Sequence, residues 1–124
     1  MNNLYGRVEY GIVDPRIRFG KTKEGAAIAF WSLGQGPNLV HLPFLPWGHV
    51  QLEWRDPELR LWYERLATFT RLVRYDGRGT GLSDRVAKSY GLEAQVSDID
   101  AVVERLGACR FSASVSWCQA GFGT

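Results

Sequence analysis

The chain alternates between short apolar runs and segments whose apolar residues have helical spacing. Residues 26–33 form an apolar run that predicts a strand. Residues 38–43 form a second run, short and bounded, which suits a strand buried on both faces. Residues 34–37 read Gly-Gln-Gly-Pro and predict a turn between the two. Residues 16–19 alternate in polarity and predict an edge strand that ends at Gly20.

Two segments have the spacing of helices. Asp56, Pro57 and Glu58 favour a helix start, because Asp caps well, Pro fits the first turn and an acid suits the positive end of the dipole. The apolar face expected of this helix is Leu59, Trp62, Tyr63 and Leu66. The face expected of a second helix, which should end at Gly107, is Leu92, Val96, Ile99, Val103 and Leu106.

Residues 71–75 and 110–115 predict two further strands. The polar, glycine-containing segment 76–84 and the second helix separate them. Strands joined through helices imply parallel pairing with right-handed crossovers. The pattern therefore predicts the α/β class, with a mostly parallel sheet and flanking helices.

The composition excludes several classes of function. A chain of 124 residues with 45% hydrophobic residues suffices for one globular domain. Its net charge of +2 is too small to indicate binding to nucleic acid or an anionic membrane. The scattered arginines are expected to lie on a solvated surface. These arginines are Arg55, Arg60, Arg65, Arg71, Arg74, Arg78 and Arg85.

The cysteines and the amino terminus indicate a cytoplasmic protein. Cys109 and Cys118 are nine positions apart and form neither a CxxC pair nor a ligand cluster, so we expect no metal and no cofactor. The first residues lack the apolar run of a signal peptide. No stretch approaches the ~20 apolar residues needed to span a bilayer.

Residues 75–84 read Tyr-Asp-Gly-Arg-Gly-Thr-Gly-Leu-Ser-Asp. This segment resembles the D-x-R-G-x-G-x-S turn that follows the fourth strand of many α/β-hydrolases. In that family the turn is structural, so the resemblance implies a structural role here, against the alternative of a generic glycine loop. The residues concerned are Asp76, Arg78, Gly79, Gly81 and Ser83.

A second segment resembles one bacterial subgroup of the same family, in which the hydrolase domain is often attached to nucleotide-cyclase or transcription-regulator domains. The residues that match its H-x-x-L-x-W-x-D-P stretch are His49, Leu52, Glu53, Trp54, Asp56 and Pro57. The resemblance covers about residues 16–121. It implies that residues 1–124 form a single partial domain, the N-terminal half of an α/β-hydrolase fold, which we expect to be truncated after the fifth strand.

In this family the nucleophile follows the fifth strand, on a sharp turn with small residues two positions to either side. The expected place, residues 112–121, contains no G-x-S-x-G. Cys118 fits best, with Ser116 and Ala120 as its small neighbours, and Ser116 is the alternative. Ser114 shares the flanking pattern. Cys118 could equally be an ordinary small buried residue.

The family's oxyanion hole uses two backbone N–H groups. The resemblance assigns them to Gln119, which follows the nucleophile, and to Phe44 or Leu45, which follow the third strand. The family usually has glycine where this chain has Phe44, whose bulk changes the hole. The triad's acid and histidine come after the nucleophile in this family. The histidines present are His41, expected in the core, and His49, expected near the pocket mouth, where it could help to bind a substrate.

Three functions remain open. The first is hydrolysis of an ester or related acyl bond, with a small-molecule acyl substrate. The second is a non-catalytic α/β-hydrolase-like module for sensing or interaction, and the third is an inactive fragment. For each, a missing C-terminal segment or a partner could complete the sheet, whereas no nucleic acid and no membrane is expected as a partner.

Overall fold

The computed structural model describes residues 14–42, 48–84, 90–108 and 110–115. The helices and strands within these ranges are β1 (Arg18–Lys21), β2 (Ala27–Leu33), β3 (Asn38–Leu42), α1 (Val50–Arg55), α2 (Pro57–Leu66), β4 (Arg71–Tyr75), α3 (Leu92–Leu106) and β5 (Ser112–Val115). All five predicted strands and both predicted helices are therefore confirmed, with bounds that shift by no more than two residues. Helix α1 was not predicted.

The five strands form one sheet in the order β1-β2-β4-β3-β5. Strand β2 pairs antiparallel with β1 and β4, whereas β3 pairs parallel with β4 and β5. Only β2 therefore runs against the others, and the predicted α/β class with a mostly parallel sheet is confirmed. Strands β1 and β5 lie at the two edges of the described sheet, which agrees with the edge position predicted for β1.

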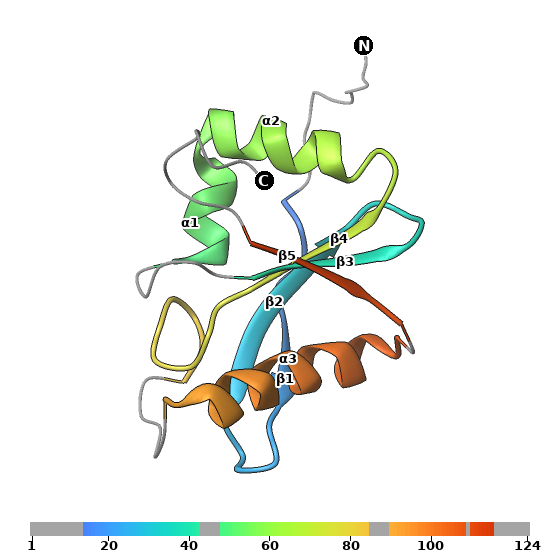
Figure 1. Cartoon of the computed structure of the whole chain (residues 1–124). Coiled ribbons are helices and arrows are strands. Elements are labelled where there is room, and N and C mark those ends of the chain that lie inside the picture. Colours follow the sequence, from blue (N-terminus) through green and yellow to red (C-terminus); the bar gives the residue numbers. More distant parts are fainter. Residues whose placement is uncertain (1–13, 43–47, 85–89, 109, 116–124) are drawn as a thin grey trace.

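The molecule has three layers, with α1 and α2 over one face of the sheet and α3 over the other (Figure 1). Alternate residues of β2 point to opposite faces, as in any strand. Phe30 belongs to the core cluster under α3, together with Val40 and Val102. Trp31 belongs to the cluster under α1 and α2, together with Val50 and Trp54. Each face of β2 is thus buried by a helical layer.

Both helix ends that the sequence predicts are present. The Asp56 carboxylate caps α2 by accepting from the Glu58 N–H at 3.0 Å. Gly107 ends α3 in the left-handed conformation, with φ of 77°. Tyr63 of the expected α2 face is buried, but Leu59 and Trp62 are exposed.

The prediction of the apolar face of α3 is partly wrong. Leu92 is 77% exposed and Val96 is 48% exposed, whereas Ile99, Val103 and Leu106 are half-buried against the core. The side of α3 that faces the sheet includes Ala101. The backbone of α3 comes so close to β1 there that a Cβ at Gly20 would collide with the Ala101 carbonyl oxygen. The buried positions of α3 are Ala94, Ser97, Asp98, Ala101 and Val102. The polar members are buried because they have partners on neighbouring segments.

The expectation that the arginines are all solvated is also wrong for two of them. Arg74 is 3% exposed and Arg78 is 7% exposed. Each pairs with a carboxylate, Arg74 with Glu53 and Arg78 with Asp98. A buried charge is retained where a partner compensates for lost hydration, and charge spacing in the sequence does not reveal such partners.

The helices of the described ranges include none that is both long and apolar enough to cross a membrane.

Candidate functional site

The carboxyl ends of three neighbouring strands meet at one edge of the sheet. Strands β3 and β5 are parallel and in register, with Leu42 opposite Val115. Strand β4 lies on the other side of β3 and is followed directly by Asp76. The predicted nucleophile Cys118, its alternative Ser116 and the predicted oxyanion-hole residues Gln119, Phe44 and Leu45 lie outside the described residues. The described part of the candidate site consists of the residues that surround the carboxyl ends of β3, β4 and β5.

Asp76 fixes the start of α1 at this edge. Its side chain is fully buried. The Val50 N–H donates to Oδ1 at 3.1 Å, and the Leu82 N–H donates to Oδ2 at 2.9 Å. Burial raises the pKa of this carboxyl, and the two N–H donors partly offset that effect. Asp76 thus joins the end of β4, the start of α1 and the far side of its own turn.

Residues 76–84 fold back beside β2. The Ser83 hydroxyl donates to the Asp76 carbonyl and accepts from the Ala29 N–H. The Asp84 carboxylate accepts from the Ala27 N–H at 2.9 Å. Gly81 has a positive φ of 49°, and a Cβ at this position would collide with the Asp76 carboxylate. The segment therefore extends the hydrogen bonding of β2 beyond the end of β4.

Arg78 ties the same turn to α3. Its Nε donates to Asp98 Oδ1 at 2.8 Å and its backbone N–H donates to Asp98 Oδ2 at 3.0 Å. A second contact joins its guanidinium to Glu24 Oε1 at 3.4 Å. Each sequence-predicted residue of the turn, from Asp76 to Ser83, thus lies in one hydrogen-bonded or closely packed segment.

His49 begins α1 as its N-cap. The ring Nδ1 accepts from the Leu52 N–H at 3.1 Å, and the His49 N–H donates to Glu53 Oε2 at 3.2 Å. The two hydrogen bonds are reciprocal, like those of a capping box. His49 is half-buried and neighbours Val50, which is bound to Asp76. The structure therefore places His49 beside the carboxyl end of β4, whereas its expected place at a pocket mouth stays a prediction.

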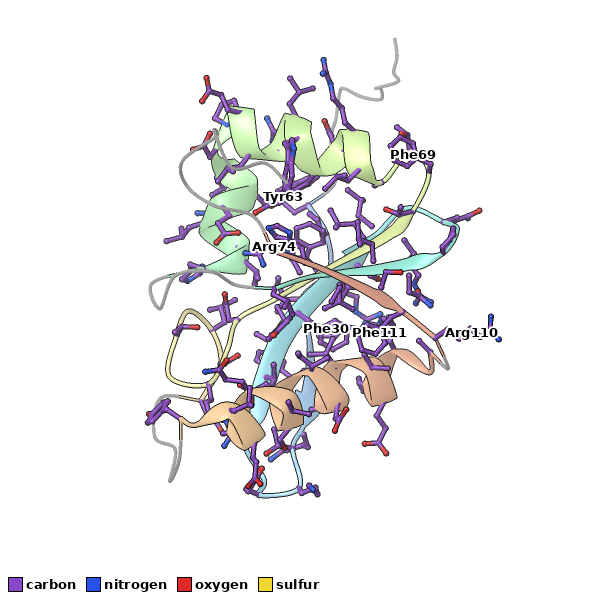
Figure 2. All side chains as sticks on the ribbon, in the orientation of Figure 1. Phe30, Tyr63, Phe69, Arg74, Arg110 and Phe111 are labelled. Atoms are coloured by element: carbon purple, nitrogen blue, oxygen red, sulfur yellow. The ribbon has the colours of Figure 1, made fainter. Side chains whose placement is uncertain are left out.

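A buried polar network underlies α1 and α2. Arg74 of β4 donates through Nε to Tyr63 Oη at 3.1 Å and pairs with Glu53 Oε1. The Tyr63 hydroxyl donates to the same Glu53 oxygen at 2.7 Å. Figure 2 shows Tyr63 and Arg74 between the upper helices and the sheet, with Phe30 on the opposite face. The network holds the helix that follows β3 against the central strand.

The charges of this network perturb one another. Burial raises the pKa of Glu53, but the Arg74 guanidinium and hydrogen bonds from Arg74, Tyr63 and His49 outweigh it, so the pKa lies below its ordinary value. Burial raises the pKa of the Tyr63 phenol well above its usual range. Glu53 is therefore ionised and Tyr63 protonated at neutral pH.

His41 is buried, as expected of a core histidine, with 6% of its surface exposed. Its ring meets Trp62 edge-on, with 5.2 Å between ring centroids, and its carbonyl accepts from Arg74 at 3.0 Å. Burial, helped by the charge of Arg74, lowers the pKa of His41 to about 4. The ring is consequently neutral near pH 7.

Sequence reasoning missed the joint role of Glu53, Tyr63 and Arg74. The available signal was Glu53 four positions after His49, a spacing that lets the two residues cap one helical turn. Sequence reasoning recognised Tyr63 only as an apolar-face position and Arg74 only as a surface position.

Among the residues that the structure describes, no three His, Cys, Asp or Glu side chains gather as metal ligands would. An open hollow of about 600 Å³ lies at the amino ends of β3 and β5, away from the carboxyl ends of these strands, and its lining includes Asn38, Arg110 and Phe111.

No protein-family model and no curated protein matches the chain by sequence. Solved structures match it by fold. A hydrolase from Pseudomonas aeruginosa superposes with a TM-score of 0.68 at 22% identity, over 81% of this chain and 36% of its own. The chain has the α/β-hydrolase fold. It corresponds to the N-terminal part of such proteins.

Two further neighbours differ in their stated activities. The esterase RhEst1 from Rhodococcus is 27% identical with a TM-score of 0.63, over 77% of this chain and 34% of its own. The bottromycin epimerase BotH, solved with bottromycin A2, is 24% identical with a TM-score of 0.64, over 82% of this chain and 39% of its own. The match thus spans about a third of the length of these proteins. Attachment to cyclase or regulator domains stays a prediction.

Proposed function

We propose that this chain supplies the nucleophile half of a hydrolase that acts on an ester or related acyl bond. Cys118 is the proposed nucleophile, with Ser116 as the alternative. The N–H groups of Gln119 and of Phe44 or Leu45 are the proposed oxyanion hole. The fold and the esterase among its neighbours support this assignment.

The observation that carries the proposal is the register of β3 and β5. Leu42 and Val115 are opposite one another on adjacent parallel strands, which are about 4.8 Å apart. Phe44 and Leu45 follow Leu42 by two and three residues, and Cys118 follows Val115 by three. Strands β3 and β5 therefore end at the same edge of the sheet, and the proposed oxyanion-hole and nucleophile residues follow them in sequence.

The proposed reaction runs through an acyl-enzyme. The Cys118 thiolate attacks the acyl carbonyl, whose oxygen gains the negative charge and accepts hydrogen bonds from the two N–H groups. The tetrahedral intermediate then expels the alcohol, which takes a proton from a general acid. Water attacks the resulting thioester, loses a proton to the same group acting as a base, and regenerates the thiolate.

The histidines in this chain are poorly suited to be that base. His41 is buried with a pKa of about 4, and the Nδ1 of His49 is engaged in the helix cap. We propose that the histidine and the orienting acid come from a further segment of the protein or from a partner. The intact mass of the protein in its natural source tests this directly. A mass near twice 14.0 kDa supports the proposal, whereas a mass of 14.0 kDa requires a separate partner.

Hydrolysis of p-nitrophenyl butyrate by that complete protein tests the nucleophile. Cys118→Ala should reduce kcat by about 10³-fold or more, as loss of a nucleophile does. Ser116→Ala is the matched control and should keep the wild-type kcat. If Ser116 is the nucleophile instead, Ser116→Ala loses activity and Cys118→Ala keeps it. Full activity in both variants refutes the proposed site.

A second candidate is a non-catalytic sensing or interaction module. The irregular elbow sequence and the engagement of both histidines favour it, and BotH is an epimerase with this fold, so the fold does not fix the chemistry. This candidate predicts saturable binding of a small acyl compound without turnover in the complete protein. Burst release of p-nitrophenol contradicts it.

A further inference from the structure

We propose that four arginines between β1, β4 and the end of α3 form a binding site for a phosphate group of a small molecule. This arginine cluster consists of Arg16, Arg18, Arg71 and Arg105, all within the described residues. Two of the four lie in β1 or just before it, and β1 is at the sheet edge opposite β5. The site is therefore distinct from the proposed catalytic one and does not depend on the hydrolase proposal.

Arg18 and Arg105 start from neighbouring points on the face of the sheet that α3 covers (Figure 1). The Arg18 guanidinium lies 5.1 Å from the centre of the Phe30 ring, which belongs to the core cluster under α3. Gly20 is two residues further along β1, so it lies on the same face as Arg18. A Cβ at Gly20 would lie 3.4 Å from the Cβ of Arg105. The end of α3 thus brings Arg105 beside β1.

Arg71 lies on the same face of the sheet. It is the first residue of β4, and the alternate residues that follow it, Val73 and Tyr75, belong to the core cluster under α3. Alternate residues of a strand share one face, so Arg71 faces the side of α3 as well. Arg16 adds a fourth positive charge two residues before β1.

The positive charges of the arginine cluster repel one another. Burial lowers the pKa of Arg18, and the charges of Arg105, Arg71 and Arg16 lower it further. Among the described residues, the ion pairs involve two other arginines, and none joins a member of the cluster to a carboxylate. The end of α3 supplies only about half a negative charge, which is too little to balance four guanidinium groups. An anion with two or more charges would relieve this repulsion.

The acids on the same half of α3 do not supply that balance. Asp100 and Glu104 line a groove of about 460 Å³ between α3 and the end of β1, and Lys21 and Lys23 line it too. That groove combines charges of both signs, whereas the arginine cluster has one sign. The cluster is therefore the place in the described structure where a multiply charged anion gains most.

The chemistry of arginine favours a phosphate group as that anion. A guanidinium is planar, and its N–H donors match two oxygens of a phosphate at once. A carboxylate brings two oxygens and one charge, so it can engage fewer of the available donors. Arg16 and Arg105 are exposed, and Arg18 and Arg71 are half-buried, so a ligand in solution can reach the cluster.

Calorimetric titration of the complete protein with pyrophosphate tests the site. Salt is kept at about 20 mM, because higher ionic strength screens exposed charges. Arg105→Gln should weaken pyrophosphate binding by about fivefold, the value of one ion pair at an exposed site. Arg65→Gln is the matched control, because Arg65 is also an exposed arginine in the last turn of a helix. It should change Kd by less than about twofold.

A second variant, Arg16→Gln, guards against a defect in α3, because Arg16 lies outside the helices and strands. It should weaken binding as Arg105→Gln does. Absence of pyrophosphate binding up to about 10 mM overturns the inference. So does a loss in Arg65→Gln as large as the loss in Arg105→Gln, which would show attraction by net charge alone. A hexaglutamate peptide that binds more tightly than pyrophosphate, with the same dependence on Arg105, overturns the phosphate assignment in favour of an acidic peptide.

Discussion

Protonation of His41 should make the folded state strongly dependent on pH. The ring is buried between β3 and α2, and its pKa in the folded state is about 4. In the unfolded chain a histidine has a pKa of about 6.5. Between these values the unfolded state binds the proton and the folded state does not. Stability therefore falls as the pH falls through about 6.5, and the loss levels off below about 4.

The difference between the two pKa values sets the size of the effect. The full shift corresponds to about 3.5 kcal/mol, at about 1.4 kcal/mol for each pKa unit. Most of it appears above pH 5, so the free energy of unfolding should fall by about 2 kcal/mol between pH 7 and pH 5 from His41 alone. Asp76 contributes with the opposite sign, because its raised pKa makes the folded state gain protons as the pH falls.

Urea unfolding of the wild type and of His41→Phe at pH 7, 6 and 5 isolates the His41 contribution. Phenylalanine keeps an aromatic ring against Trp62 and removes the titrating group, while Asp76 and Glu53 are common to both proteins. The difference in unfolding free energy between the two should change by about 2 kcal/mol across this range, in favour of the variant at low pH. Parallel pH profiles for the two proteins would refute the buried, neutral assignment of His41.

Two further predictions concern stability. Glu53→Ala leaves the Arg74 guanidinium buried beside Tyr63 and should cost about 3 kcal/mol in urea unfolding, whereas the exposed Glu104→Ala should change stability by less than about 0.5 kcal/mol. Equal effects would show that the ion pair contributes nothing. Gly34→Ala and Gly25→Ala share a φ near +90°, but a Cβ at Gly34 meets the carbonyls of Ala67 and Thr70 while one at Gly25 meets nothing within 4 Å. Gly34→Ala should therefore lower the unfolding free energy by about 2 kcal/mol more than its control, and equal losses would exclude the collision.

The strands and two longer helices were predictable because local signals and tertiary packing agree. The Asp56-Pro57 start of α2 and the Gly107 end of α3 are set by residues next to them in sequence. Helix α1 has six residues and an uncommon histidine cap. It is held by Val50 and Trp54 against Trp31, from a distant strand. No local pattern contains that contact, so sequence reasoning passed over the helix.

The candidate site was predictable in part for a similar reason. The turn after β4 has glycines and polar residues whose spacing already indicates its shape. The burial of Arg74 and Asp98 depends on partners 21 and 20 residues away along the chain. Polarity alone placed Arg74 on the surface and favoured Val96 over Asp98 as a buried position of α3. Pairing, which decides whether a charge can be buried, is a property of the fold.

The strand order has a consequence for how the chain acquires its shape. Strands β2 and β3 are neighbours in sequence but are separated in the sheet by β4. Phe30 of β2 pairs with Tyr75 of β4, which is synthesised 45 positions later. Strand β3 pairs only with β4 and β5 in the described sheet, so it cannot pair until one of them has been synthesised. During synthesis only the β1–β2 hairpin can close early. Since distant pairing slows folding, the rate-limiting step should be the entry of β4 between two strands that have already been made.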